Sequence, residues 1–163
     1  MEPYAAALRD RCPDTVVTLA RTPEQERKLI ADASVVTGIT VEPDLVEAAS
    51  NLELFARVFA GTDHVPVDAL AARGIPVTNA AGTHAPGIAE QPIGSMLVFT
   101  RRLHEAWRRQ GTAEWRRFRS VEFTDSTVTV VGSGAIGRAI TRRLAGFGVD
   151  TIGIRYTPSK GAD

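Results

Sequence analysis

The stretch that decides the fold runs from Ser126 to Gly137 and reads STVTVVGSGAIG. Its first six residues are β-branched or small, with an apolar end, which predicts a buried strand. Three glycines follow in the spacing G-x-G-x-x-G. A helix is expected to begin there and to end at two further glycines, and Val149–Ile154 is then expected to form a second strand. This strand-turn-helix-strand order predicts the first unit of a Rossmann dinucleotide-binding domain.

Each glycine of this turn has its own physical task. The first allows a tight turn, the second lets the backbone approach a pyrophosphate, and the third lets helix and strand pack closely. The free amides and partial positive charge of the helix start favour an anion. We therefore predict that the phosphates bind at Gly132, Gly134, Ala135, Ile136 and Gly137. The alternative is an ordinary glycine-rich turn.

The end of the second strand indicates which nicotinamide cofactor binds. An acidic side chain there accepts hydrogen bonds from an unmodified adenosine ribose. This chain instead has Arg155, followed by Tyr156 and Thr157. A guanidinium and hydroxyl groups suit a ribose 2′-phosphate, so the sequence favours NADP(H) over NAD(H). A solvated basic loop is the alternative for these three residues.

Upstream, predicted helices and strands alternate, which is typical of a parallel sheet. Thr22 is a predicted N-cap, with Pro23 at the first helical position. The predicted helices cover Pro3–Arg11, Thr22–Ala33, Pro43–Ala49 and Pro66–Arg73, and the predicted strands cover Thr15–Ala20, Ser34–Ile39, Leu52–Phe59 and Pro76–Asn79.

Between these elements and the glycine turn, residues 86–109 predict one long helix with a broad apolar face. We place a domain boundary near Ala85, between a first domain of residues 1–85 and a second of residues 86–163. Three aromatic residues of the connector, Trp115, Phe118 and Phe123, are expected to pack against the second domain.

The composition limits the classes of function. The 163 residues include 44% hydrophobic ones, enough for a core, and 19 basic side chains balance 19 acidic ones. A net charge of zero gives no whole-chain field that would attract nucleic acid or an anionic membrane, so we predict neither partner. Cys12 is the only cysteine and the N-terminus has no long apolar run. We therefore predict a cytoplasmic protein without a disulfide, a metal or a membrane span.

Three segments together resemble the D-isomer-specific 2-hydroxyacid dehydrogenases, and their sequences are most similar to those of haloarchaeal members. They are AGTDHVPVDAL (60–70), GIPVTNAAGTHAPGIAEQ (74–91) and TVTVVGSGAIG (127–137), in the family's order and spacing. The resemblance implies a flavodoxin-like parallel-sheet substrate domain, followed by a Rossmann cofactor domain. It also implies hydride transfer between a nicotinamide cofactor and a small 2-hydroxy or 2-keto acid.

By this resemblance two loops face the substrate. Gly38 and Ile39 in one loop, and Gly61 and Thr62 in the other, are expected to offer backbone amides to its carboxylate. Simple strand-end turns are the alternative. His84 stands where the family has an asparagine near the nicotinamide, and it either binds substrate or caps the helix that follows.

The resemblance further implies that the catalytic arginine, glutamate and histidine follow the second Rossmann strand. We therefore expect no catalytic residue in this chain, an incomplete cofactor domain, and a substrate domain without its first strand. The apolar sheet edges left exposed predict a homodimer or other self-association. The rival hypothesis is a non-catalytic dinucleotide-binding or self-associating module.

Overall fold

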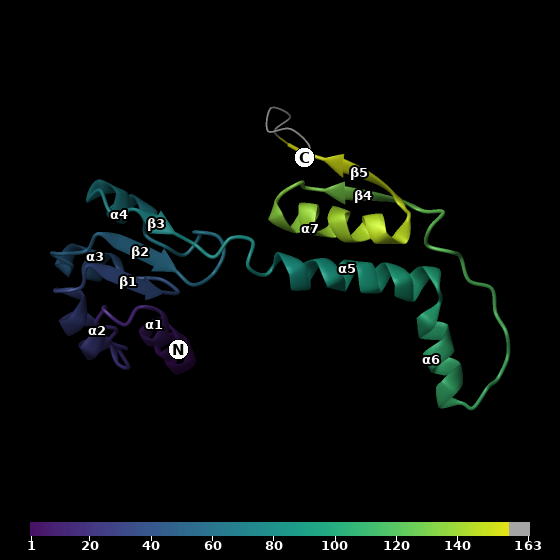
Figure 1. Cartoon of the computed structure of the whole chain (residues 1–163), viewed down its shortest axis with the longest axis horizontal. Coiled ribbons are helices and arrows are strands. Elements are labelled where there is room, and N and C mark those ends of the chain that lie inside the picture. Colours follow the sequence, from purple (N-terminus) through teal and green to yellow (C-terminus); the bar gives the residue numbers. More distant parts are fainter. Residues whose placement is uncertain (157–163) are drawn as a thin grey trace. The chain divides into compact units, whose positions relative to one another are not determined.

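The computed structural model describes residues 1–156 and divides into two compact units, Met1–Ala80 and a second unit that begins at Ala81. Each unit has its own parallel sheet (Figure 1). Each also has its own hydrophobic core. The predicted α/β class is confirmed. Among the described residues, no helix combines the length and the apolar character needed to cross a bilayer.

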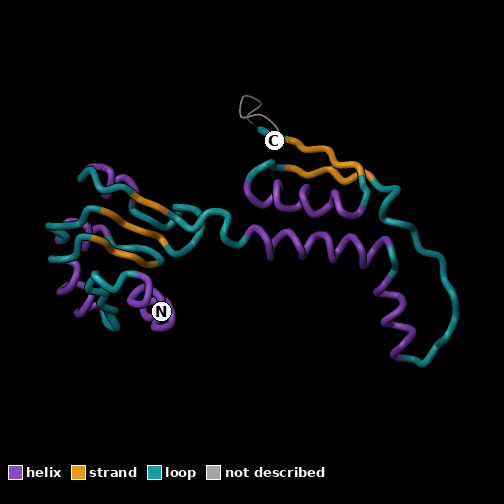
Figure 2. Tube along the Cα trace, viewed as in Figure 1, coloured by secondary structure: helices purple, strands orange, loops and turns teal. Residues whose placement is uncertain are grey.

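The first unit is built on a three-stranded parallel sheet of order β1-β2-β3, drawn in orange in Figure 2. Its strands are β1 (Val35–Gly38), β2 (Leu54–Arg57) and β3 (Val77–Thr78), and its helices are α1 (Glu2–Arg11), α2 (Pro23–Ile30), α3 (Pro43–Ala48) and α4 (Val67–Ala72). Helices α3 and α4 connect successive strands. Because the strands are parallel, their carboxyl ends share one edge of the sheet.

Phe55 of β2 is the centre of this unit's core and is fully buried. Val46 of α3 and Leu70 of α4 belong to the same buried cluster, so both connecting helices cover this face of the sheet. On the other face, the Thr37 hydroxyl lies 3.1 Å from the Tyr4 hydroxyl of α1. The predicted cap of α2 is confirmed, since the Thr22 hydroxyl accepts a hydrogen bond from the Gln25 amide.

The predicted strand over Thr15–Ala20 is wrong. These residues have no regular structure, and Val16 is 94% exposed. A strand needs a neighbour that satisfies its backbone groups, however high its β-propensity. Among the described residues β1 pairs only with β2, so this run has no strand beside it.

The second unit pairs two parallel strands and covers one of their faces with helices. Its elements are α5 (Ala85–Thr100), α6 (Leu103–Gly111), β4 (Thr127–Val131), α7 (Ala135–Leu144), a 3-10 turn (Ala145–Phe147) and β5 (Asp150–Ile154). The core joins Ile93 of α5, Val130 of β4 and Leu144 of α7. Val131 and Ile152 are on the uncovered face and are exposed.

The single helix predicted over residues 86–109 is in fact two helices. Thr100 ends α5, and Arg102 adopts a left-handed conformation with φ of 52° before α6 begins. The cause is visible at Thr100, whose carbonyl accepts a hydrogen bond from the Val121 amide at 2.9 Å. The returning connector therefore takes an acceptor that a continuous helix would have used.

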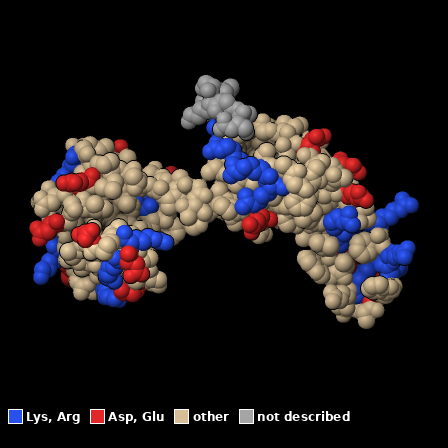
Figure 3. Space-filling model, viewed as in Figure 1, with Lys and Arg blue, Asp and Glu red and all other residues tan. Residues whose placement is uncertain are grey.

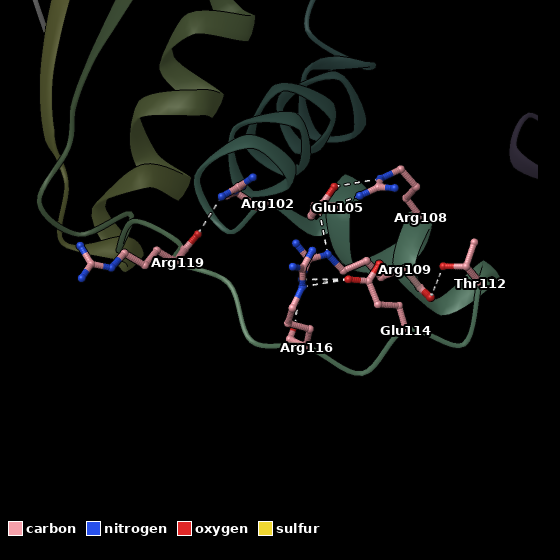
Figure 4. Close-up of polar contacts among 8 residues, drawn as sticks. All are labelled: Arg102, Glu105, Arg108, Arg109, Thr112, Glu114, Arg116 and Arg119. Carbon is pink, nitrogen blue, oxygen red and sulfur yellow. Dashed lines mark hydrogen bonds and ion pairs between the residues drawn. The ribbon is translucent and has the colours of Figure 1, made fainter.

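We call α6 and residues 112–121 the arm. Arg109 is its buried centre: it donates to the Glu105 carboxylate at 2.7 Å and to the Arg116 carbonyl at 3.0 Å (Figure 4). Its guanidinium also lies 5.0 Å from the centre of the Phe118 ring. Arg109 thereby holds the connector against α6.

The aromatic residues of the connector divide into three cases. Phe123 is buried in the core of the second unit, as predicted. Phe118 packs under Arg102 and Arg109 within the arm. Trp115 is fully exposed, so its predicted packing is wrong. An aromatic residue predicts burial only where a neighbouring element covers it.

Glu105 makes the arm sensitive to acid. Hydrogen bonds from Arg108 and then Arg109 lower the pKa of its carboxyl from 4.5 to about 2. Because the folded pKa is depressed, the stabilisation is present above the unfolded pKa and is lost as the pH falls from about 4.5 toward 2. We expect Glu105→Gln to lower the thermal midpoint at pH 7 and to lose this difference near pH 2.

The measurement is the thermal midpoint of wild type and variant between pH 2 and 7. Glu122→Gln, a substitution of an exposed glutamate outside the arm, is the matched control and should run parallel to wild type. A difference between wild type and Glu105→Gln that stays constant with pH would contradict the role of this ion pair.

Candidate functional site

The glycine turn joins β4 to α7 and is tied to β5. Gly132 has a φ of +98°, a conformation that favours glycine. Its amide donates to the carbonyl of Ile154 at 2.8 Å, which continues the β4–β5 pairing into the turn. The first glycine therefore makes the tight turn that the sequence predicts.

Gly137 allows α7 to lie directly against the turn. A Cβ at this position would overlap the Gly132 carbonyl oxygen and would lie 3.3 Å from the Val130 side chain. Gly134, the N-cap of α7, is the opposite case, because a Cβ there would meet no atom within 4 Å. The third glycine is thus required by packing, whereas the second borders open space.

The start of α7 offers free backbone donors. The Arg138 amide makes the first helical hydrogen bond, to the Gly134 carbonyl at 2.9 Å. The amides of Ala135, Ile136 and Gly137 precede it and have no helical acceptor. Three such amides at the positive end of a helix suit an anionic group such as a phosphate.

His84 belongs to the same unit as the glycine turn. It occupies the N-cap position of α5, yet its imidazole makes no capping hydrogen bond, so the alternative of a side-chain cap is wrong. A Cβ at Gly82 would lie 3.7 Å from the Ala135 side chain, and Ala85 packs against Ala139. The starts of α5 and α7 therefore lie side by side, with His84 exposed beside them.

The residues predicted to select the cofactor follow β5. Arg155 comes directly after Ile154 and is half-buried, whereas Tyr156 is fully exposed. Thr157 lies outside the described residues. No acidic side chain directly follows β5, where its carboxylate would contact the adenosine ribose. Arg155 places a guanidinium there instead.

In the first unit, the two predicted substrate loops meet at the carboxyl edge of the sheet. Gly38 ends β1, and the Thr40 hydroxyl donates to the His64 carbonyl in the loop after β2. The Asn79 amide group donates to the Gly61 carbonyl at 3.5 Å, which adds the loop after β3. Ligands of parallel sheets bind outside this edge. The side chains of Ile39 and Thr62 are exposed here.

Arg57 is a candidate residue that the motifs missed. It ends β2 opposite Gly38, and it is only 9% exposed. Its Nε and Nη1 atoms are buried and have no hydrogen-bond partner among the described residues. A buried cation without a partner is costly, whereas an anion at this edge would satisfy it. The available signal was an arginine inside the apolar run LFARVF.

The comparison with protein families decides what this site belongs to. Residues 93–163 match the family model described as "D-isomer specific 2-hydroxyacid dehydrogenase, NAD binding domain". That range contains the glycine turn and α7 in full. Residues 93–163 therefore belong to the D-isomer specific 2-hydroxyacid dehydrogenase family. The resemblance carried by the three sequence segments is thereby confirmed.

Curated relatives extend the likeness to the first unit of the chain. A D-3-phosphoglycerate dehydrogenase of Mycobacterium leprae is 35% identical over 142 residues, which are 86% of this chain and 26% of the relative. A hydroxypyruvate reductase of Thermotoga maritima is 31% identical, over 85% of this chain and 44% of the relative. The chain thus spans between about a quarter and less than half of the length of these relatives.

Solved structures agree with the fold of this chain. A D-lactate dehydrogenase of Treponema pallidum has a TM-score of 0.76 at 23% identity, covering 96% of this chain and 50% of that one. An NAD-dependent formate dehydrogenase of Staphylococcus aureus in complex with NAD has a TM-score of 0.66 at 22% identity, covering 98% and 51%. The matched family model is described as NAD binding, and the formate dehydrogenase structure contains NAD. Neither supports a preference for NADP(H).

The close approach at the third glycine gives a direct test of the turn. We expect Gly137→Ala to lower the free energy of unfolding by about 1–3 kcal/mol, because the added methyl group overlaps backbone atoms. Gly94→Ala is the control: it lies inside α5 with open space around its Cβ and should stabilise by up to about 1 kcal/mol. Denaturant unfolding measures both. Equal effects of the two substitutions would show that α7 does not pack on Gly132.

Proposed function

We propose that this chain binds a nicotinamide dinucleotide at the glycine turn. The observation that carries the proposal is the combination at the start of α7, where three amides have no helical acceptor and Gly134 borders open space. The dinucleotide would supply the hydride chemistry when bound. The residues of this chain would hold its diphosphate.

We further propose that the whole protein interconverts a 2-hydroxy acid and the corresponding 2-keto acid. Support comes from the family and from relatives that are named as dehydrogenases and reductases of this kind. The catalytic arginine, glutamate and histidine of that reaction are not assigned to any residue of this chain. Its part would be to bind the cofactor and to contact the substrate.

The substrate contact that we propose lies at the carboxyl edge of the first sheet. Arg57 provides a buried positive charge, and the loops of Gly38 and Gly61 provide backbone amides. A carboxylate is the group that these donors suit best. The predicted binding role of His84, which belongs to the second unit, stays a prediction.

NADP(H) rather than NAD(H) is the cofactor that we propose. The support is chemical: Arg155 carries a positive charge where an acidic residue would select an unmodified ribose. Self-association and a cytoplasmic location stay predictions. The exposed apolar face of β4 and β5 supports the first of these.

The first test measures dinucleotide binding. We expect wild type to bind NADPH more tightly than NADH in calorimetric titrations, and Arg155→Gln to lose that preference. Gly134→Ala should weaken both by at least about tenfold, or about 1.4 kcal/mol of binding free energy, because its methyl group fills the space that the diphosphate needs.

Gly94→Ala, on the exposed side of α5, is the matched control and should bind as wild type does. A wild-type chain that binds neither dinucleotide would contradict the proposed function. Tighter binding of NADH would contradict the role of Arg155 alone.

The second test concerns the substrate carboxylate. Glycolate, the smallest 2-hydroxy acid, should raise the thermal midpoint of wild type, since a ligand of the folded state stabilises it. Arg57→Leu should abolish this shift without lowering the midpoint in the absence of ligand, because it removes an unpaired buried cation. Arg27→Leu, which removes an exposed arginine of α2, should retain the shift. A shift that survives in Arg57→Leu would exclude Arg57 from the substrate site.

A further inference from the structure

The charged side chain of Arg138 reaches the glycine turn, and neither the motif nor the family match assigns it a task. Arg138 is the fourth residue of α7 and directly follows Gly137. Its side chain turns back toward the start of the helix, and Nη1 donates to the carbonyl of Ser133 at 3.0 Å. Ser133 lies between the first two glycines of the turn, so the guanidinium is anchored at the turn itself.

The charge of Arg138 is unfavourable unless an anion is nearby. A cation near the N-terminus of a helix opposes the helix dipole. The first turn of α7 has no acidic residue, and among residues 1–156 Arg138 forms no ion pair. Arg142 follows at i+4 and adds like charge, and Figure 3 shows basic side chains gathered over α7. Arg138 thus places positive charge at the end of the helix where three amides are free, whereas Arg142 lies in the last turn.

The hydrogen bond to Ser133 has a second consequence. A carbonyl oxygen within a phosphate-binding turn repels the phosphate oxygens, unless a donor neutralises it. Arg138 supplies that donor with one of its five N–H groups. The remaining N–H groups have no hydrogen-bond acceptor within the described part of the chain.

We propose that Arg138 is a positioning residue for the cofactor diphosphate: it holds the Ser133 carbonyl and adds positive charge beside the free amides of Ala135, Ile136 and Gly137. This inference rests on the proposed dinucleotide site. It predicts that the binding energy at this turn depends on one side chain as well as on the backbone.

The test compares Arg138→Gln, Arg138→Lys and Arg142→Gln by calorimetric titration with ADP-ribose, which contains the diphosphate, and with adenosine, which contains no phosphate. We expect Arg138→Gln to weaken ADP-ribose binding by roughly five- to tenfold, the loss of a charged hydrogen bond. Arg138→Lys should lose less, because it keeps the charge and a donor. Binding of adenosine should be the same in all variants.

Salt dependence separates the charge from a structural effect. The affinity of wild type for ADP-ribose should fall more steeply with salt than that of Arg138→Gln, because the variant has one positive charge fewer that salt can screen. Arg142→Gln removes the same charge from the last turn of α7 and should keep the wild-type affinity for ADP-ribose.

Three results would overturn the inference: wild-type affinity in Arg138→Gln, an equal loss in Arg142→Gln, or an equal loss for adenosine. The last would assign Arg138 a purely structural role. A wild-type chain that binds neither ADP-ribose nor a dinucleotide would overturn the proposed function together with this inference. The three results above leave wild-type binding intact and would overturn the inference alone, so the two failures are distinguishable.

Discussion

The contact between Gly137 and the Gly132 carbonyl is the constraint on which the second unit depends. Because no Cβ fits between them, α7 lies as close to the end of β4 as backbone atoms permit. That closeness brings the start of the helix, with its free amides, to the turn. It also places Ala139 against Ala85, which lets α5 begin beside α7. A single missing methyl group thus sets the geometry of the candidate cofactor site.

Arginine serves three different purposes in this chain. Arg109 is buried and fully engaged, with a carboxylate, a carbonyl and an aromatic ring as partners, so its charge stabilises the arm. Arg57 is equally buried but has two nitrogens without a partner, which marks it as a residue that needs a ligand. Arg138 is intermediate: it donates one hydrogen bond to a carbonyl, and its positive charge forms no ion pair within the described residues. The number of satisfied donors, rather than burial, separates the structural Arg109 from the two arginines for which we propose a ligand.

The sequence predicted the glycine turn and the strand-turn-helix-strand order around it, because those features depend on neighbours in the chain. It failed where a segment distant in the sequence determines the local conformation. The break at Arg102 depends on the Val121 amide, and the absence of a strand at Thr15–Ala20 depends on which strands lie beside it. Arg57 and Arg138 were missed for a related reason. A motif defines the backbone of a binding turn, whereas the unsatisfied donors of a single side chain emerge only from its folded surroundings.

The separate cores of the two units have a consequence for cooperativity. Phe55 and Leu144 belong to different clusters, so each unit buries its own apolar surface. Units with separate cores can unfold in separate transitions, and a single free energy of unfolding then no longer describes the chain. A ligand of one unit would raise one transition and leave the other in place, which would report directly on the unit that the ligand occupies.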